Sequence, residues 1–199
     1  MGFFGPSKKE VWQKLAEEIN ADYVDKGFWK GDKVEARVGN WIVVLDTYTV
    51  STGKSSITYT RMRAPFINLN KFYFKIYRKG IFSDLGKVLG MQDITVGFNE
   101  FDEDFIIKGN DEEKLKQLFS NERIRVLIEG QPQINLEIKD DEGYFAVHFP
   151  EGVDELYFLV TGVIRDIDRL KELYDLFAEV LKMLSDIGVA STEEPGIIL

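Results

Sequence analysis

The feature that most constrains the fold is a series of short segments in which apolar residues alternate with polar ones or form β-branched runs. Every second residue of 33–38 is apolar, and a Gly-Asn turn separates this run from the β-branched stretch 41–50. Further strands are expected at 56–63, 71–79, 134–139, 145–149 and 156–164. Strands joined by short turns pair antiparallel, so the pattern predicts two antiparallel β-meanders.

Two amphipathic helices flank these meanders. Ser7 and Glu10 form a capping box, which starts a helix that ends near Asn20. Apolar residues at helical spacing between Asp166 and Ile187 predict a long final helix, with a stripe broad enough to cover a sheet. A shorter helix is expected at 83–89. The predicted fold class is α+β, with both meanders covered by the N-terminal and the long C-terminal helix.

The domain organisation follows from length and from the order of these elements. A chain of 199 residues is long enough to bury one substantial core. We expect a single domain at 1–188, with a division into lobes 1–97 and 98–188 as the alternative, and a flexible tail at 189–199. The sequence is also compatible with an arrangement in which the two meanders face each other.

The stretch between the meanders combines a strand with the start of a helix. Phe101, Phe105 and Ile107 are expected on one side of an extended segment, which the Gly-Asn pair at 109–110 interrupts. Asn110 or Asp111 then caps a helix whose acidic first turn suits the positive end of the helix dipole.

Three phrases in this region and before it carry a resemblance. They are F-D-E-D-F-I-I-K-G-N-D-E-E-K-L-K-Q-L-F-S at 101–120, I-R-V-L-I at 124–128 and T-R-M-R-A-P-F at 60–66. Together they resemble a pattern found in uncharacterised prokaryotic proteins classed as domains of unknown function. The resemblance covers about half of the chain and implies a compact α+β module, without catalytic residues to carry over.

Composition excludes several kinds of site. The chain has no cysteine, which rules out disulfides, thiolate metal sites, iron–sulfur clusters and cysteine nucleophiles. No segment approaches the roughly 20 consecutive apolar residues of a membrane helix. We therefore expect a cytoplasmic protein without a membrane span, and neither a metal nor a cofactor.

Charge is distributed unevenly, and this points to a candidate contact surface. The net charge is −9, but residues 47–83 contain no Asp or Glu and carry +7, which leaves −16 on the remainder. An extended 71–79 would place cations and aromatic rings on one side, and Arg61 and Arg63 are added to this surface. The candidate partner-binding residues are Arg61, Arg63, Lys71, Tyr73, Lys75, Tyr77 and Lys79. Such a face suits single-stranded nucleic acid, anionic headgroups or an acidic protein. A solvated face, or one paired internally with the acidic part of the chain, is the simpler interpretation.

Other motifs carry weaker signals. Gly53-Lys54-Ser55 lacks the earlier glycine of a phosphate loop, because Tyr48 stands there, and is interpreted as a hairpin turn. His148, the only histidine, is interpreted as a sheet-face residue rather than a general base.

Carboxylates are the remaining candidates. Asp102 and Asp104, and the turn at 140–142, are interpreted as ordinary turn and helix-start residues without calcium-loop spacing. Asp46 lies in the expected central strand and needs a partner if buried, and Arg61 or Arg63 on the next strand can supply one.

These observations favour a non-enzymatic binding or interaction module that uses the basic aromatic face. Its expected partner is an unidentified protein or an anionic ligand; nucleic acid is less favoured because the chain is acidic overall, and a homodimer is compatible with the sequence. One alternative is an enzyme acting on an anionic small molecule, with Arg61 and Arg63 as the clamp and Asp46 or His148 handling protons. Another is a carrier of an apolar ligand, with a cavity between the sheets and the last helix.

Overall fold

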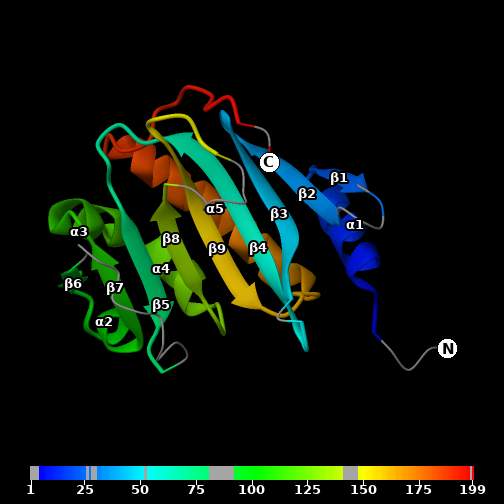
Figure 1. Ribbon diagram of the computed structural model, residues 1–199. Helices are drawn as coiled ribbons and strands as arrows, with labels where there is room; N and C mark the ends of the chain where they lie inside the picture. Colours follow the sequence, from blue (N-terminus) through cyan, green and yellow to red (C-terminus); the bar gives the residue numbers. More distant parts are fainter. Residues whose placement is uncertain are drawn as a thin grey trace.

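The computed structural model describes residues 5–25, 27, 31–51, 53–80, 92–140, 148–197 and 199. Within these residues, nine strands form one antiparallel sheet in the order β1-β2-β3-β4-β9-β8-β5-β7-β6 (Figure 1). The strands are β1 (Asp22–Asp25), β2 (Asp32–Val38), β3 (Trp41–Ser51), β4 (Ser56–Ile67), β5 (Phe74–Arg78), β6 (Gln92–Ile94), β7 (Phe105–Gly109), β8 (Asn135–Lys139) and β9 (Val153–Thr161).

Helices cover one face of the sheet. In the described residues they are α1 (Lys8–Glu18), α2 (Asn99–Asp104), α3 (Glu112–Ser120), α4 (Glu122–Glu129) and α5 (Ile167–Asp186). Figure 1 shows α5 running diagonally behind the sheet, with α1 beside β1 and β2. The predicted α+β class, with an antiparallel sheet, an N-terminal helix and a long C-terminal helix, is confirmed.

The core lies between the sheet and these helices. Strand register aligns one apolar residue from each of seven strands in a continuous row, and each is at most 2% exposed. The row consists of Val34, Leu45, Met62, Phe158, Leu136, Ile76 and Ile107. Buried residues of α5 pack against it, and Tyr174 of this helix donates a hydrogen bond to the main-chain oxygen of Val34 at 3.1 Å.

Local sequence explains where the helices begin. The predicted capping box is present: Ser7 accepts a hydrogen bond from the main-chain N–H of Glu10, and Glu10 accepts one from Ser7 in return. Asp111 and Asp166 cap α3 and α5 with their carboxylates, which lie where the helix dipole favours negative charge.

The two meanders share one sheet, so the face-to-face arrangement is wrong. β9 pairs with β4 and β8 pairs with β5, which inserts two strands of the second meander between two strands of the first. The segments 1–97 and 98–188 therefore contribute alternating strands to the same sheet and side chains to the same core.

Several expected boundaries differ from the structure, and the strand expected at 156–164 is β9 at Val153–Thr161. The strand expected at 56–63 continues past Pro65 to Ile67, because Pro65 lies beyond the β3–β4 ladder, which ends at Arg63, and faces only β9. The segment around Phe101 is helical rather than extended, and β7 begins at Phe105. Asp102 causes this turn, since its carboxylate accepts hydrogen bonds from the main-chain N–H groups of 96, 97 and 98.

The strand expected at 71–79 is shorter than its pattern. β5 begins only at Phe74, and Lys71 has a left-handed φ of 53°. Asn68 and Asn110 hold the preceding turn, since Asn68 bonds to the main chain of Phe72 and Asn110 to that of Lys71 and Tyr73. The helix expected at 83–89 and most of the strand expected at 145–149 lie outside the described residues.

Candidate binding surface on the open face of the sheet

The sheet face opposite the helices, here called the open face, carries charged and polar residues in register. One row across it reads Glu35, Val44, Arg63, Tyr157, Glu137 and Lys75. Three charged residues of the open face are buried although no described helix covers them: Arg63 is 4% exposed, Lys75 is 6% exposed and Glu155, two residues before Tyr157 on β9, is 0% exposed. Burial makes charge pairing on this face energetically important.

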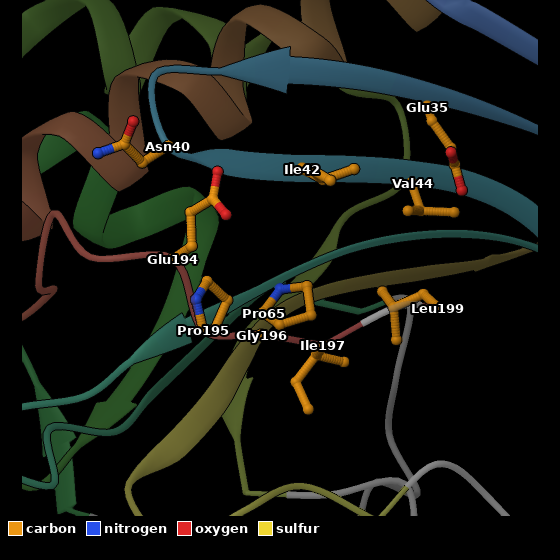
Figure 2. Close-up of a pocket in the computed structure, with 10 residues that line it drawn as sticks. All are labelled: Glu35, Asn40, Ile42, Val44, Pro65, Glu194, Pro195, Gly196, Ile197 and Leu199. Atoms are coloured by element: carbon orange, nitrogen blue, oxygen red, sulfur yellow. The ribbon is translucent and has the colours of Figure 1, made fainter.

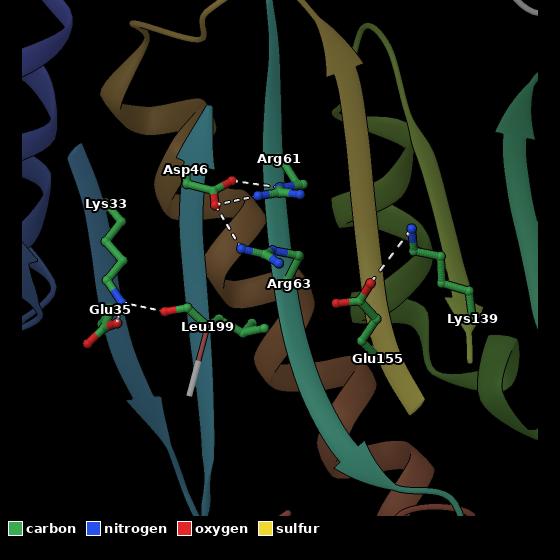
Figure 3. A network of polar contacts seen from close by, with 8 residues as sticks. All are labelled: Lys33, Glu35, Asp46, Arg61, Arg63, Lys139, Glu155 and Leu199. Atoms are coloured by element: carbon green, nitrogen blue, oxygen red, sulfur yellow. Dashed lines mark hydrogen bonds and ion pairs between the residues drawn. The ribbon is translucent and has the colours of Figure 1, made fainter. Parts of the chain in front are cut away.

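Asp46 binds two arginines at the centre of the β2–β4 part of this face (Figure 3). Arg61 donates from Nε and Nη2 to the two carboxylate oxygens at 2.8 and 2.7 Å, and Arg63 donates from Nη2 at 2.8 Å. The predicted pairing of Asp46 with a neighbouring arginine is confirmed. Burial alone would raise the pKa of Asp46, but the hydrogen bonds from Arg61 and the charges of both arginines outweigh it and hold the pKa below its ordinary value.

Lys33 extends this charged group along β2. Its ammonium forms an ion pair with Glu35 and donates a hydrogen bond to the main-chain oxygen of Leu199 at 2.6 Å. A cavity of about 290 Å³ is lined by Lys33 and Leu199 together with Asp46, Arg61 and Arg63. The surface thus brings cations of β2 and β4 close to the C-terminal part of the chain.

Residues 191–197 and 199, here called the return segment, lie over the open face (Figures 1 and 2). The main-chain N–H of Ser191 bonds to the oxygen of Ile67, the Asn40 amide donates to the oxygen of Thr192 at 2.5 Å, and Arg37 pairs with Glu194 at 3.0 Å. Immediately before it, Val189 and Ala190 are buried, and Ala190 bridges to Asn68. The mobility expected for 189–199 stays a prediction, but these contacts give the segment a defined place.

An apolar cavity of about 320 Å³ lies between the return segment and the sheet (Figure 2). Ile42, Val44 and Pro65 line it from β3 and β4. Glu35 and Asn40 are at its side, and Glu194, Pro195, Gly196, Ile197 and Leu199 line it from the return segment. Sequence reasoning missed this site, because neither an apolar residue such as Ile42 nor a polar terminal stretch indicates that the two meet.

The β3–β4 hairpin continues the open face beyond the sheet. Tyr48, Val50 and Ile57 are 43%, 37% and 42% exposed, and they lie on the same side as Asp46 because side chains alternate along a strand. The Arg61 guanidinium lies 5.2 Å from the centre of the Tyr48 ring. This exposed apolar strip is contiguous with the Asp46 group, and singly exposed apolar residues elsewhere are less informative than such a strip.

The predicted basic aromatic face is largely paired within the chain. Lys75 is buried and pairs with Glu137 at 3.0 Å, and Lys79 donates to the main-chain oxygen of Asp102 at 2.9 Å. Tyr77 is 6% exposed, and Lys71 lies outside β5. Internal pairing was one of the alternatives that the sequence left open, and the role of this face in binding stays a prediction.

A third cavity, of about 460 Å³, is lined by residues that include Tyr73, Asp140, His148 and Asp154. Asp154 is 5% exposed and accepts a hydrogen bond from Asn68 at 2.5 Å, and burial is the main reason that its pKa is raised. His148 is exposed and lines this cavity, whereas Asp46 lines the one near Leu199. The two groups proposed for proton handling in the enzyme alternative therefore do not line the same cavity.

Other expected features have ordinary structural roles. Gly53 and Lys54 lie in the turn between β3 and β4, where Gly53 has a left-handed φ of 79°, as expected for a hairpin. Among the described residues, no three His, Asp or Glu side chains are placed to hold a metal ion. In the same residues, no helix combines the length and the apolarity needed to cross a membrane.

Comparisons with known proteins give a fold relationship. No family model and no curated protein matches this chain. Among solved structures, the fold is similar to the crystal structure of the mycobacterial trehalose monomycolate transport factor A, TtfA, with a TM-score of 0.54. The two sequences are 8% identical, and the similarity covers 92% of this chain and 98% of that one. The resemblance to uncharacterised prokaryotic proteins stays a prediction.

Proposed function

We propose that this chain is a non-enzymatic binding module whose contact surface is the open face over β2, β3 and β4. The observation that carries the proposal is the apolar cavity between this face and the return segment, which lies beside the charged group of Lys33, Asp46, Arg61 and Arg63. Apolar lining with a few fixed polar groups is the usual composition of a ligand-binding site.

The charges of this surface favour a ligand with an anionic group. Arg61 and Arg63 line the cavity near Leu199 and both bind Asp46. Arg37, whose side chain is 62% exposed, pairs with the Glu194 carboxylate of the return segment, so the surface already accommodates an anionic group. Arg61 and Arg63, two of the residues expected from the sequence, thus belong to the proposed surface. The other five, Lys71, Tyr73, Lys75, Tyr77 and Lys79, remain a proposed extension of it toward β5.

Site-specific photo-crosslinking tests the proposal with a matched control. A photoreactive amino acid replaces Tyr48 on the open face in one protein and Val126 on α4 in another, since these side chains are 43% and 49% exposed. After irradiation in extract of the cells that make the protein, we expect defined adducts from position 48 and none from position 126. Equal adducts from both positions, or adducts only from position 126, would contradict the proposal.

A carrier of an apolar ligand is the second candidate. Two observations favour it: the cavity of about 320 Å³ is lined mainly by apolar residues, and TtfA, a protein with a similar fold, is a trehalose monomycolate transport factor. This cavity lies on the open face, and not between the sheet and α5 where the sequence hypothesis placed it. Native mass spectrometry separates the two candidates, since a carrier purified with its ligand shows an additional mass that denaturation removes.

A further inference from the structure

We infer that the open face recognises a peptide that carries a carboxylate followed by aliphatic residues, and that the return segment is its internal counterpart. The inference rests on the proposed function, because it names the ligand of the same surface. The segment reads S-T-E-E-P-G-I-I-L, and its contacts with the sheet show which chemistry the surface accepts.

The contacts place the segment beside β2 and the turn that follows it. Thr192 meets Asn40, Glu194 meets Arg37 and Leu199 meets Lys33. Thr192 and Leu199 are seven positions apart, as are Asn40 and Lys33, so the segment runs antiparallel to this stretch. It bends on the way, because Gly196 has a left-handed φ of 69°.

Two of these contacts are independent of side chains in the bound segment. Asn40 and Lys33 donate to main-chain oxygens, of Thr192 and Leu199, which any peptide in this position presents. Specificity comes from the other contacts. Arg37 binds the Glu194 carboxylate, and the cavity lined by Ile42, Val44 and Pro65 is also lined by Pro195 and Ile197. The surface therefore selects a carboxylate and, about three residues later, an aliphatic side chain.

The internal segment is held weakly enough to be replaced. The side chains of Arg37 and Glu194 are 62% and 66% exposed, and ion pairs in such positions contribute little. Between 192 and 199, among the described residues, the polar contacts with the sheet involve side chains of the sheet and no main-chain ladder. The cavity of about 320 Å³ beneath the segment is space that its own side chains leave unfilled.

An external peptide must compete with this tethered segment. A segment joined to its site by a short linker acts at an effective concentration on the order of millimolar, so the intact protein binds a competing peptide only weakly. Weakening the internal contacts raises the fraction of molecules whose surface is vacant, and the apparent affinity rises in proportion to that fraction.

Fluorescence polarisation with a labelled peptide tests this competition in the full-length chain. The probe is the peptide S-T-E-E-P-G-I-I-L, blocked at both ends, with a scrambled peptide as control. In one protein Glu194→Arg and Ile197→Asp weaken the internal segment at two positions that are not buried. We expect this variant to bind the probe at least about tenfold more tightly than the unaltered protein.

Two further substitutions in that variant locate the binding. Arg37→Glu, on the proposed surface, should weaken probe binding by about three- to tenfold, because it replaces an exposed attraction with a repulsion, whereas Arg123→Glu on α4, where the side chain is 55% exposed, should leave it unchanged. Circular dichroism and thermal unfolding of each variant check that the fold is retained.

Four outcomes would overturn the inference: equal probe affinity in the unaltered and weakened proteins, equal affinity for the scrambled peptide, no effect of Arg37→Glu, or dimers that exchange return segments and exclude the probe. Light scattering detects such dimers. If the probe fails while position 48 still gives specific adducts, the peptide class is wrong and the proposed function stands. If position 48 fails as well, both are wrong.

Discussion

Asp46 is the residue on which the charged part of the open face depends. It binds Arg61 through both oxygens and Arg63 through one, and the three side chains are 17%, 12% and 5% exposed. Removing one partner of a buried ion pair leaves the opposite charge without compensation. We expect Asp46→Asn to lower the free energy of unfolding by about 3 kcal/mol, as measured by urea denaturation at pH 7.

The pH dependence gives this prediction a sign. The folded pKa of Asp46 lies below its ordinary value of 3.8, so its contribution to stability is present above pH 3.8 and disappears as the pH falls through the folded pKa. The difference between the unaltered protein and Asp46→Asn should therefore shrink in acid. Asp175→Asn is the matched control, because Asp175 pairs with Arg123 at the surface, with side chains 58% and 55% exposed. An equal loss in both variants would contradict the role given to Asp46.

At the residue scale, the sequence predicted a side-chain contact correctly where the register of a hairpin determines which residues face each other. Asp46 lies directly opposite Arg61 in a hairpin, so the pairing follows from the turn between the two strands. The hydrogen bond between Asn68 and Asp154 spans 86 positions and depends on the insertion of β9 beside β4, which no local pattern indicates.

The junction of β7 and α3 shows how tightly elements meet in this fold. Gly109 is the last residue of β7, and a Cβ atom there would collide with Leu115 of α3 and lie 3.0 Å from the main-chain oxygen of Tyr73. We expect Gly109→Ala to cost about 1–3 kcal/mol of stability, because the helix or the 71–73 turn must shift.

Thermal or urea unfolding measures this cost against a second glycine. Gly5 has no heavy atom within 4 Å of a Cβ built on it, and its φ is outside the left-handed region, so Gly5→Ala should not change stability. Unchanged stability in Gly109→Ala would show that α3 is not constrained at this strand end.

At the element scale, the sequence predicted the kind of most elements and missed some boundaries. The capping box and the apolar stripe of α5 are local signals, and the structure has both. The prediction for the start of β7 was wrong, because the alternation of Phe101 with its neighbours resembles a strand. In the structure the Asp102 carboxylate instead accepts hydrogen bonds from three main-chain N–H groups directly before α2.

At the scale of the whole molecule, strand order determines where the site lies. β9 and β8 sit between β4 and β5, so the charged row of the open face runs through strands from both parts of the chain. The α+β class was predictable because alternation and short turns are local. The interleaved order was not, because pairing between distant strands depends on the assembled core.

The same scale explains the position of the return segment. α5 crosses the helix-covered face, and the chain that follows it turns past Asn68 to the opposite face (Figure 1). A short polar stretch after a helix has no pattern that predicts such a path. Its position over Ile42 and Arg37 is what joins the apolar cavity to the charged group in a single surface.

The central claim is that a ligand binds where the return segment lies, and locking that segment in place tests it most directly. The chain has no cysteine, so the pair Asn40→Cys and Thr192→Cys introduces its only thiols at two residues that are in contact. Intact mass identifies the oxidised protein. We predict that the labelled S-T-E-E-P-G-I-I-L peptide binds the reduced protein at least about tenfold more tightly than the oxidised one. Equal binding in both states would contradict the claim, since the ligand would then not need the surface that the segment covers.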